Sequence, residues 1–226
     1  MSKSTVYCLG GWSLSPDLLD VVFTDNSMFI DSNVAIDSIV DTGMLLDTWI
    51  PKLIQTYFGS FTCDTILAGW STGAMIAAAL APLLQPKALI LLSPTLSFIR
   101  RDSYTFGTKS SLVTSMINEL AADKHKVLEQ FHKRCGFETL QNSENYSVPL
   151  LQKGLFFLQQ ADLLVSPPPT CPVICMHGTG DSIIPVKAGH YACEHLRGSM
   201  HTFDGGHQFF IHHTNEIKTI IESQVR

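Results

Sequence analysis

The chain has 226 residues, of which 45% are hydrophobic and 15% are charged, and its formal net charge is −5 at pH 7. This composition excludes a disordered chain, which would contain few apolar and many charged residues. The acidic balance also gives no general reason to bind nucleic acid, because phosphates attract clustered Lys and Arg. One globular core domain is expected, although two domains are compatible with this length.

An uncharged run of 22 residues, 65–86, is nominally long enough to span a bilayer. Gly69, Ser71 and Pro82 interrupt it, and no polybasic flank supplies an orientation signal. We therefore interpret the run as a buried strand followed by a buried helix, with no membrane partner. The N-terminal apolar run, residues 6–9, is too short for a secretion signal. The expected location is the cytoplasm.

Short apolar runs alternate along the chain with segments of helical periodicity. The apolar runs predict strands at residues 5–9, 34–40, 65–69, 88–92, 173–177 and 201–203. The periodic segments predict helices at residues 15–23, 48–58, 72–84, 186–196 and 208–225. Strands that alternate with helices form a mostly parallel sheet covered on both faces. The sequence therefore predicts an α/β protein.

The stretch from residue 98 to residue 169 breaks this alternation. It has helical patterns at 112–122, 125–135 and 150–164 but no convincing buried strand. Three consecutive prolines, 167–169, end it and resist further helix. We interpret residues 98–169 as a helical cap inserted into a core made of residues 1–97 and 170–226.

Residues 69–73, Gly-Trp-Ser-Thr-Gly, match a G-x-S-x-G motif between a predicted strand and a predicted helix. In that context the motif is a nucleophile elbow, in which a tight turn presents the serine at the edge of the sheet. The start of the following helix directs backbone N–H groups toward a developing oxyanion. Ser71 could instead simply cap the helix, but the flanking strand and glycines favour a nucleophile.

A serine hydroxyl needs a base to take its proton and an acid to orient that base. Downstream, Asp181 lies in a glycine-spaced loop after a predicted strand, and His207 follows the last predicted strand. The order Ser71, Asp181, His207 is the chain order of α/β-hydrolase triads, and we assign these roles to the three residues. The alternatives are that Asp181 caps the next helix and that His207 lies in a surface loop.

Other residues fit these roles less well. Asp204 starts too close to His207 in sequence to approach Nδ1 from the expected side, and His212 and His213 lie well inside the last predicted helix. His177 is interpreted as a packing residue at a strand end. The remaining histidines and the six cysteines lack the spacing of a zinc site, so no metal is predicted.

An oxyanion hole needs two backbone N–H groups, one of them from the residue after the nucleophile, here Thr72. We assign the second to Trp12, which follows two glycines at the end of the first predicted strand. Glycine has no Cβ, so the backbone there can approach the reacting carbonyl closely. An ordinary strand-to-helix turn is the alternative interpretation.

With these residues in place, the chain resembles the α/β-hydrolases and, more narrowly, the BioH-type carboxylesterases of biotin synthesis, which demethylate pimeloyl-[acyl-carrier protein] methyl ester. The likeness rests on Gly11-Trp12, on residues 69–73, and on residues 92–102, where an Arg-Asp pair leads into the cap. Leu9 and Ala74 depart from the family's usual His and Gly, and there is no room for N-terminal hairpin strands. A sheet of about six strands is therefore expected.

The resemblance implies an esterase that works through an acyl-enzyme, without metal or cofactor, on an acyl-carrier protein bearing a pimeloyl methyl ester. The predicted cap has eight Lys and Arg against seven Asp and Glu, whereas the rest of the chain is net negative. We therefore expect basic cap residues to dock the acidic carrier, namely Arg100, Arg101, Lys124, Lys126, Lys133 and Arg134. A solvated face with ordinary i, i+4 pairs is the alternative.

Two other functions remain open from the sequence. One is a different capped hydrolase with the same triad, acting on small esters or acyl thioesters without a carrier partner. The other is a non-catalytic binding protein with the hydrolase fold.

Overall fold

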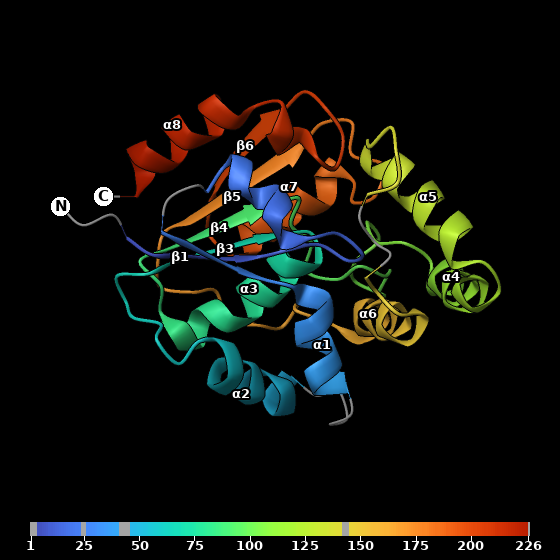
Figure 1. The fold of residues 1–226 in the computed structure, drawn as a ribbon. Coiled ribbons are helices and arrows are strands. Elements are labelled where there is room, and N and C mark those ends of the chain that lie inside the picture. Colours follow the sequence, from blue (N-terminus) through green and yellow to red (C-terminus); the bar gives the residue numbers. More distant parts are fainter. Residues whose placement is uncertain (1–3, 24–25, 41–45, 142–144, 226) are drawn as a thin grey trace.

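The computed structural model describes residues 4–23, 26–40, 46–141 and 145–225. Within them, six parallel strands form one sheet in the order β2-β1-β3-β4-β5-β6 (Figure 1). Their bounds are β1 Val6–Leu9, β2 Ser27–Ile30, β3 Ile66–Trp70, β4 Ala88–Leu92, β5 Val173–Gly178 and β6 Ser199–Phe203. The predicted α/β class and the expected number of strands are confirmed.

Helices cover both faces of this sheet (Figure 1). One face packs against α1 (Ser32–Val40), α2 (Leu46–Tyr57) and α3 (Thr72–Leu84). The other packs against the 3-10 helices η1 (Pro16–Val21) and η2 (Phe209–Ile211) and against α8 (Thr214–Gln224), while α7 (Val186–His195) lies along β5. Successive residues of β4 point into the two cores alternately and are fully buried. Burial on both faces explains why the central strands read as continuous apolar runs.

The uncharged run at residues 65–86 forms β3 and α3, and every residue from 65 to 81 is buried in the core. The prediction of a buried strand followed by a buried helix is therefore confirmed. No helix in the described part of the chain combines the length and apolar character needed to cross a membrane.

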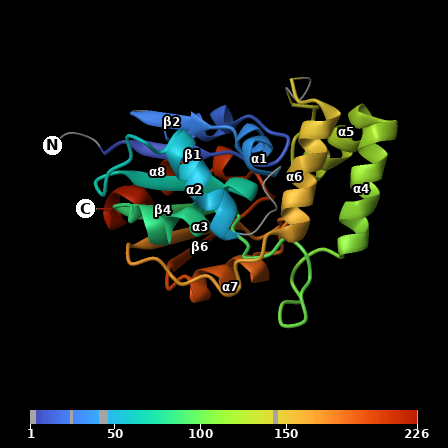
Figure 2. The same cartoon turned by 90° about the horizontal axis from the view of Figure 1, so that it is seen from below.

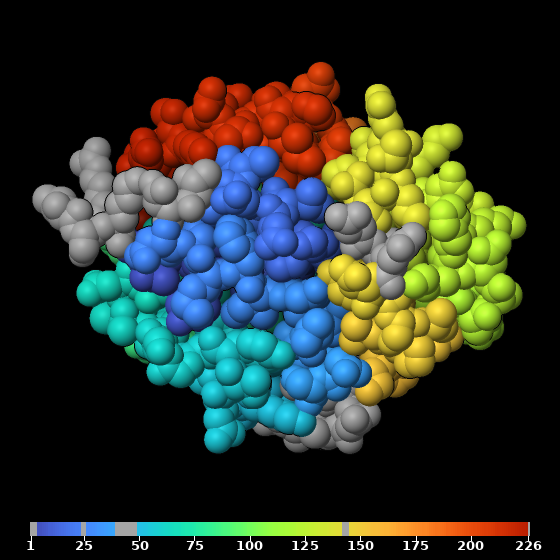
Figure 3. All heavy atoms as spheres, in the orientation of Figure 1, coloured from blue at the N-terminus to red at the C-terminus, as the bar shows by residue number. Residues whose placement is uncertain are grey.

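The stretch predicted as a cap contains three helices between β4 and β5: α4 (Ser110–Ala122), α5 (Lys124–Cys135) and α6 (Val148–Gln160). We call residues 98–169 the cap. Its helices lie together to one side of the sheet (Figures 1 and 2), and they contact loops that follow β1 and β5. On the surface, the yellow cap atoms adjoin the blue N-terminal and red C-terminal segments, and the green cap atoms lie farther out (Figure 3). The cap thus faces the carboxyl edge of the sheet.

The strand predicted at residues 34–40 is wrong, because this segment belongs to helix α1. The strand that pairs with β1 at this edge of the sheet is instead β2, which precedes α1. Its Ile and Val content favours a strand, but Asp31 starts a helix. The Asp31 carboxylate accepts a hydrogen bond from the Asn33 N–H at 2.8 Å, and its carbonyl accepts one from the Ala35 N–H at 2.9 Å. In β2 the apolar run Met28-Phe29-Ile30 has only three residues, and of these only Ile30 is buried.

Candidate active site

Ser71 lies in the turn between β3 and α3 with a strained backbone, at φ 58° and ψ −116°. The two motif glycines make this turn possible. A Cβ at Gly69 would lie 2.3 Å from the Gly73 carbonyl oxygen, and one at Gly73 would lie 2.2 Å from the Leu9 carbonyl oxygen. Although Ser71 occupies the N-cap position of α3, its side chain makes no capping hydrogen bond within the described structure. The hydroxyl is thus left for another role.

Asp181 and His207 form a buried hydrogen-bonded pair after the neighbouring strands β5 and β6. The His207 Nδ1–H donates to Asp181 Oδ2 at 2.7 Å, and Asp181 Oδ1 accepts from the N–H groups of Ile183 and Ile184 at 2.8 and 2.9 Å. Burial alone would raise the pKa of Asp181, but electrostatic attraction to His207 and hydrogen bonds from His177 and His207 hold that pKa well below its usual range. The carboxylate is therefore ionised and orients the ring of His207.

His207 is held next to the nucleophile elbow through its backbone carbonyl. This carbonyl accepts hydrogen bonds from the Trp70 indole N–H at 3.0 Å and from the Ser93 hydroxyl at 3.4 Å. The ring centroids of His207 and Trp70 are 5.4 Å apart, and Trp70 directly precedes Ser71. Among the residues that the structure describes, the buried Nε2 of His207 has no hydrogen-bond partner. An unsatisfied ring nitrogen at this place suits a base that waits for a proton.

His177, which the sequence suggested to be a packing residue, also contacts the proposed catalytic acid. Its Nε2 lies 3.3 Å from Asp181 Oδ2, the same oxygen that accepts from His207. This Nε2–H also donates to the Ile184 carbonyl at 2.8 Å. The contact needs Gly189, because a Cβ there would lie 2.2 Å from Nδ1 of His177. The spacing of four residues between His177 and Asp181 is the sequence signal that could have pointed to this pair.

The rival acid and bases lie elsewhere. Asp204 is exposed, and its backbone carbonyl accepts a hydrogen bond from the His213 ring at 2.8 Å. His212 is exposed as well. Both histidines lie at the junction between η2 and α8, so the continuous helix predicted at 208–225 is wrong: it consists of two pieces.

We call residues 10–13, between β1 and η1, the oxyanion loop. A Cβ at Gly11 would lie 3.6 Å from the Cβ of Ser71, so this loop runs beside the elbow and beside Thr72, the first residue of α3. Trp12 is buried, and its indole N–H donates to the Leu151 carbonyl of α6 at 2.9 Å. Gly11 and Thr72 therefore both lie beside Ser71, and the oxyanion roles of the Trp12 and Thr72 N–H groups stay a prediction.

Helix α1 fixes the oxyanion loop from the core side. The Ser32 hydroxyl donates to the Gly10 carbonyl at 2.6 Å. The Asn33 side chain accepts from the Ser13 N–H at 3.0 Å and donates to the Gly11 carbonyl at 3.4 Å. Sequence reasoning missed Ser32 and Asn33 because it assigned the segment after them to a strand.

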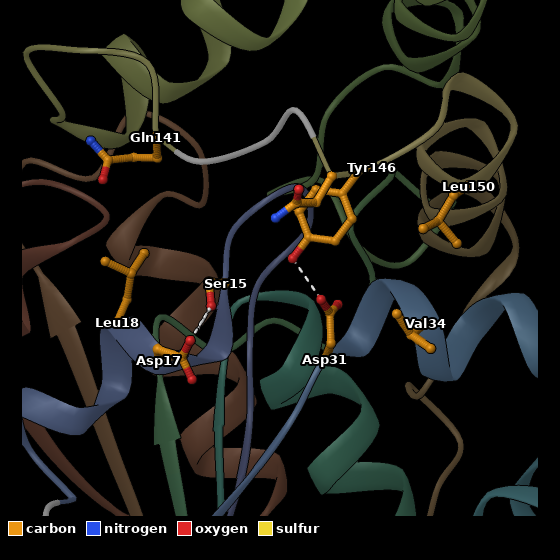
Figure 4. A pocket seen from close by; sticks show the side chains of 9 residues that line it. Ser15, Asp17, Leu18, Asp31, Val34, Gln141, Tyr146 and Leu150 are labelled. Atoms are coloured by element: carbon orange, nitrogen blue, oxygen red, sulfur yellow. Dashed lines mark hydrogen bonds between the residues drawn. The ribbon is translucent and has the colours of Figure 1, made fainter.

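A pocket of about 520 Å³ lies between η1, the start of α1 and the segment that leads into α6 (Figure 4). The Tyr146 hydroxyl donates to Asp31 there at 2.6 Å, and the Ser15 hydroxyl donates to Asp17 at 2.9 Å. The described residues that line this pocket include none of the predicted catalytic or oxyanion residues.

The second pocket, of about 350 Å³, lies between α4, α5 and the core. Much of its lining is apolar and includes Phe98, Val113, Met116, Val127, Phe131 and Ile183. Phe131 packs edge-on against Trp12, with ring centroids 4.8 Å apart, and Ile183 donates its N–H to Asp181. Although it is the smaller of the two, this pocket borders the site.

Arg101, one of the basic residues predicted to dock a partner, ties together the ends of the cap. Its guanidinium donates to the carbonyl oxygens of Gln159, Gln160 and Ala161 at 3.1 to 3.3 Å, and it lies 3.5 Å from the Asp162 carboxylate. These carbonyls are at the C-terminal end of α6, where the helix leaves them without internal donors. Arg101 is therefore a helix cap.

The other predicted docking residues differ in their surroundings. Lys124 donates to the Tyr146 carbonyl at 3.0 Å, and the exposed Arg100 donates to the Gly107 carbonyl at 2.9 Å. Two exposed lysines of α5 lie seven residues apart and hence on one helix face, Lys126 and Lys133. Arg134, next to them, is exposed too, but its guanidinium donates to the Ser182 carbonyl at 2.8 Å.

No known family model matches the chain. The pimeloyl-[acyl-carrier protein] methyl ester esterase of Aromatoleum aromaticum is 26% identical to it over 207 residues, which cover 81% of each chain. The protein of the same name from Nitrosomonas europaea is 29% identical over 147 residues, which cover 58% of each. Among solved structures, an esterase from Exiguobacterium antarcticum superposes with a TM-score of 0.80 at 20% identity, covering 99% of this chain and 92% of its own. The bromoperoxidase of Bacillus anthracis superposes at 0.77 with 14% identity, covering 98% and 91%.

The structural comparison shows the α/β-hydrolase fold, and the curated relatives are named as esterases. The fold family expected from the sequence is confirmed. Within this class, the chain is similar to curated proteins named pimeloyl-[acyl-carrier protein] methyl ester esterase, which is also the family that its motifs resemble.

Proposed function

We propose that this protein is a serine carboxylesterase that hydrolyses the methyl ester of pimeloyl-acyl-carrier protein in biotin synthesis. One observation carries the proposal: the buried Asp181–His207 pair, with Nε2 of His207 unpaired within the described structure, lies next to the strained Ser71. Similarity to esterases of that name over 81% of the chain supports the choice of substrate. The proposal places the protein in the cytoplasm with its carrier and requires no metal or cofactor.

In the first half-reaction, Ser71 Oγ attacks the ester carbonyl while His207 Nε2 takes its proton. The N–H groups of Trp12 and Thr72 donate to the oxyanion of the tetrahedral intermediate. Asp181 stabilises the imidazolium of His207. When the intermediate collapses, the C–O bond to the methoxy group breaks, and His207 gives it the proton. Methanol leaves, and the acyl group remains esterified to Ser71.

In the second half-reaction, water attacks the acyl-enzyme. His207 takes a proton from this water as the oxygen adds to the acyl carbonyl, and the same N–H groups donate hydrogen bonds to the new oxyanion. Collapse breaks the bond to Ser71, which recovers its proton from His207. The product is the free carboxylic acid, still attached to its carrier.

The pocket between α4, α5 and the core suits the acyl chain of this substrate. It borders Trp12 and Asp181 through Phe131 and Ile183, and its apolar lining favours methylene groups over water. We assign carrier docking to the exposed face of α5, where Lys126 and Lys133 can meet acidic side chains.

The test compares three substrates: pimeloyl-carrier methyl ester, p-nitrophenyl esters of graded chain length, and an acyl thioester. The proposal expects the highest kcat/KM on the carrier ester, and Ser71→Ala abolishes turnover. Higher kcat/KM on a small ester or thioester would identify a different capped hydrolase. Absence of turnover together with absence of fluorophosphonate labelling at Ser71 would identify a non-catalytic binding protein.

A genetic test asks whether the chain restores growth without biotin to a bacterial strain that lacks its pimeloyl methyl esterase. Ser71→Ala is the control. Growth supported equally by both forms would contradict the mechanism, since hydrolysis would then not require the Ser71 hydroxyl.

A further inference from the structure

Ser13, the last residue of the oxyanion loop, is held from two sides. Its φ of 59° lies in the left-handed region that serine rarely occupies. Its N–H donates to Asn33 of the core at 3.0 Å, and its hydroxyl lies 3.0 Å from Nε2 of His132 on cap helix α5. Both Ser13 and His132 are 0% exposed. A strained residue adjoining Trp12 thus depends on one core contact and one cap contact.

The hydrogen bonds of His132 determine where its proton lies. The Gln141 N–H donates to Nδ1 at 3.1 Å, so Nδ1 carries no hydrogen. The ring proton is therefore on Nε2 and is donated to the Ser13 hydroxyl oxygen. Burial lowers the pKa of His132 to about 4, so the ring is neutral at pH 7. His132 is a buried donor with a defined direction.

We propose that His132 is a positioning residue for ester hydrolysis: by holding Ser13 it sets the position of the adjoining Trp12 N–H, so that the cap helps to align the oxyanion hole. The inference rests on the proposed function of Ser71. A second hydrogen bond links the loop to the cap, because the Trp12 indole N–H donates to the Leu151 carbonyl of α6. Oxyanion donors stabilise the transition state only when they are already aligned with the oxyanion.

A matched pair of substitutions separates positioning from packing. In His132→Gln, the longer side chain can place an amide N–H where Nε2 was and keep the donor to Ser13. In His132→Asn, the shorter side chain can place its amide oxygen where Nδ1 was, which keeps the acceptor for Gln141 but loses the donor to Ser13. Both variants bury an amide in place of the imidazole, so their folding costs are similar.

With a p-nitrophenyl ester, we expect His132→Asn to lower kcat about tenfold, a fraction of the hundredfold or larger loss that follows removal of an oxyanion donor. KM should change little, because the ground-state ester makes weaker use of the oxyanion hole. His132→Gln should retain most of kcat. A trifluoromethyl ketone, which adds Ser71 to form an oxyanion, should bind His132→Asn more weakly by the same factor as the loss in kcat/KM.

Ser13→Ala removes the same hydrogen bond from the core side. Circular dichroism and Tm show whether His132→Asn folds, and if it does not, Ser13→Ala alone tests the positioning role. It should lower kcat to a similar extent, and the double variant should lose no more than the worse single one, because both remove one interaction. Equal losses in His132→Asn and His132→Gln, or an unchanged kcat in Ser13→Ala, would overturn the proposal. Failure of the proposed function is distinguishable, since the wild-type chain would then show no turnover and no labelling at Ser71.

Discussion

Arg134 and Ser182 exchange hydrogen bonds across the boundary between cap and core. The Arg134 guanidinium donates to the Ser182 carbonyl at 2.8 Å, and the Ser182 hydroxyl donates to the Arg134 carbonyl at 3.0 Å. Since Ser182 directly follows Asp181, a substitution at Arg134 disturbs the loop of the proposed catalytic acid as well as any docking surface. Carrier docking is therefore tested more cleanly at Lys126 and Lys133.

Reversing the charge of both lysines, in Lys126→Glu/Lys133→Glu, should raise KM for the carrier-linked ester about tenfold, because each exposed ion pair contributes up to about 1 kcal/mol. KM for a p-nitrophenyl ester should not change. Steady-state kinetics at low and high salt measure both values, and high salt should shrink the difference. Lys52→Glu, at an exposed position of α2, is the control with the same type of charge change. An equal effect on the two substrates would refute docking on this face.

Asp181→Asn should lower kcat about 10⁴-fold, because a neutral amide neither selects the right tautomer of His207 nor stabilises its imidazolium. Pre-steady-state kinetics with a p-nitrophenyl ester would show the loss in the acylation burst. His177→Gln is the companion variant: it removes an imidazole from the same carboxylate and should cost far less than Asp181→Asn. A loss of under tenfold in Asp181→Asn would exclude Asp181 as the acid of the triad.

The same carboxylate makes stability depend on acid pH. The folded-state pKa of Asp181 is depressed, whereas in the unfolded chain it is about 3.9. Its contribution to stability is therefore present above about pH 4 and is lost as the pH falls toward the folded-state pKa. Urea unfolding between about pH 2 and 7 should show a shallower decline in acid for Asp181→Asn than for the wild-type chain.

His132 acts in a higher pH range. Burial places its folded-state pKa at about 4, while an unfolded histidine titrates near about 6.5. Between these values the unfolded chain binds more protons, so stability falls as the pH drops from about 6.5 to about 4, by a total of about 3 kcal/mol. His132→Gln should remove this slope in urea unfolding experiments. An unchanged slope would show that the ring does not remain neutral in the folded protein.

Gly154 of α6 provides a fifth prediction. A Cβ there would lie 2.5 Å from Cδ1 of the Trp12 indole, so Gly154→Ala should displace Trp12 and lower kcat by at least about tenfold. Alanine favours the helix over glycine by about 1 kcal/mol, and this gain offsets part of any loss in the free energy of unfolding. Gly59→Ala is the control, because a Cβ there would meet nothing within 4 Å. Full activity in Gly154→Ala would show that the indole position is not critical.

Residues with strong local patterns were predictable from the sequence. The bounds predicted for β4 and α3 agree with those observed, because β4 is apolar at every position and α3 starts at the elbow. The edge strand β2 was missed because its apolar run, residues 28–30, is only three residues long. The helix after it was misassigned for a different reason: four of the seven residues at 34–40 are β-branched, which favours a strand, and the Asp31 cap that starts α1 is a weaker signal.

Contacts between distant parts of the chain had no local signal. Arg101 was expected to face a partner, yet its carbonyl acceptors lie about sixty residues downstream at the end of α6. Likewise, Ser13 and His132 are 119 residues apart in sequence and meet only once the cap is folded against the core. The Asp181–His207 pair could be anticipated because both residues follow strands of one parallel sheet, whose carboxyl ends share an edge.

The cap leaves the core after β4 and returns at β5, and these two strands are paired neighbours in the sheet. The two ends of the cap also lie side by side, because the Leu163 N–H donates to the Leu96 carbonyl at 2.9 Å. The length of the cap can therefore vary without changing the register of any strand. An exchange of caps between hydrolases of this fold would be a natural way to alter substrate range. A transplanted cap would also have to bring its own donor for the Ser13 hydroxyl, so specificity and catalytic rate would be inherited together.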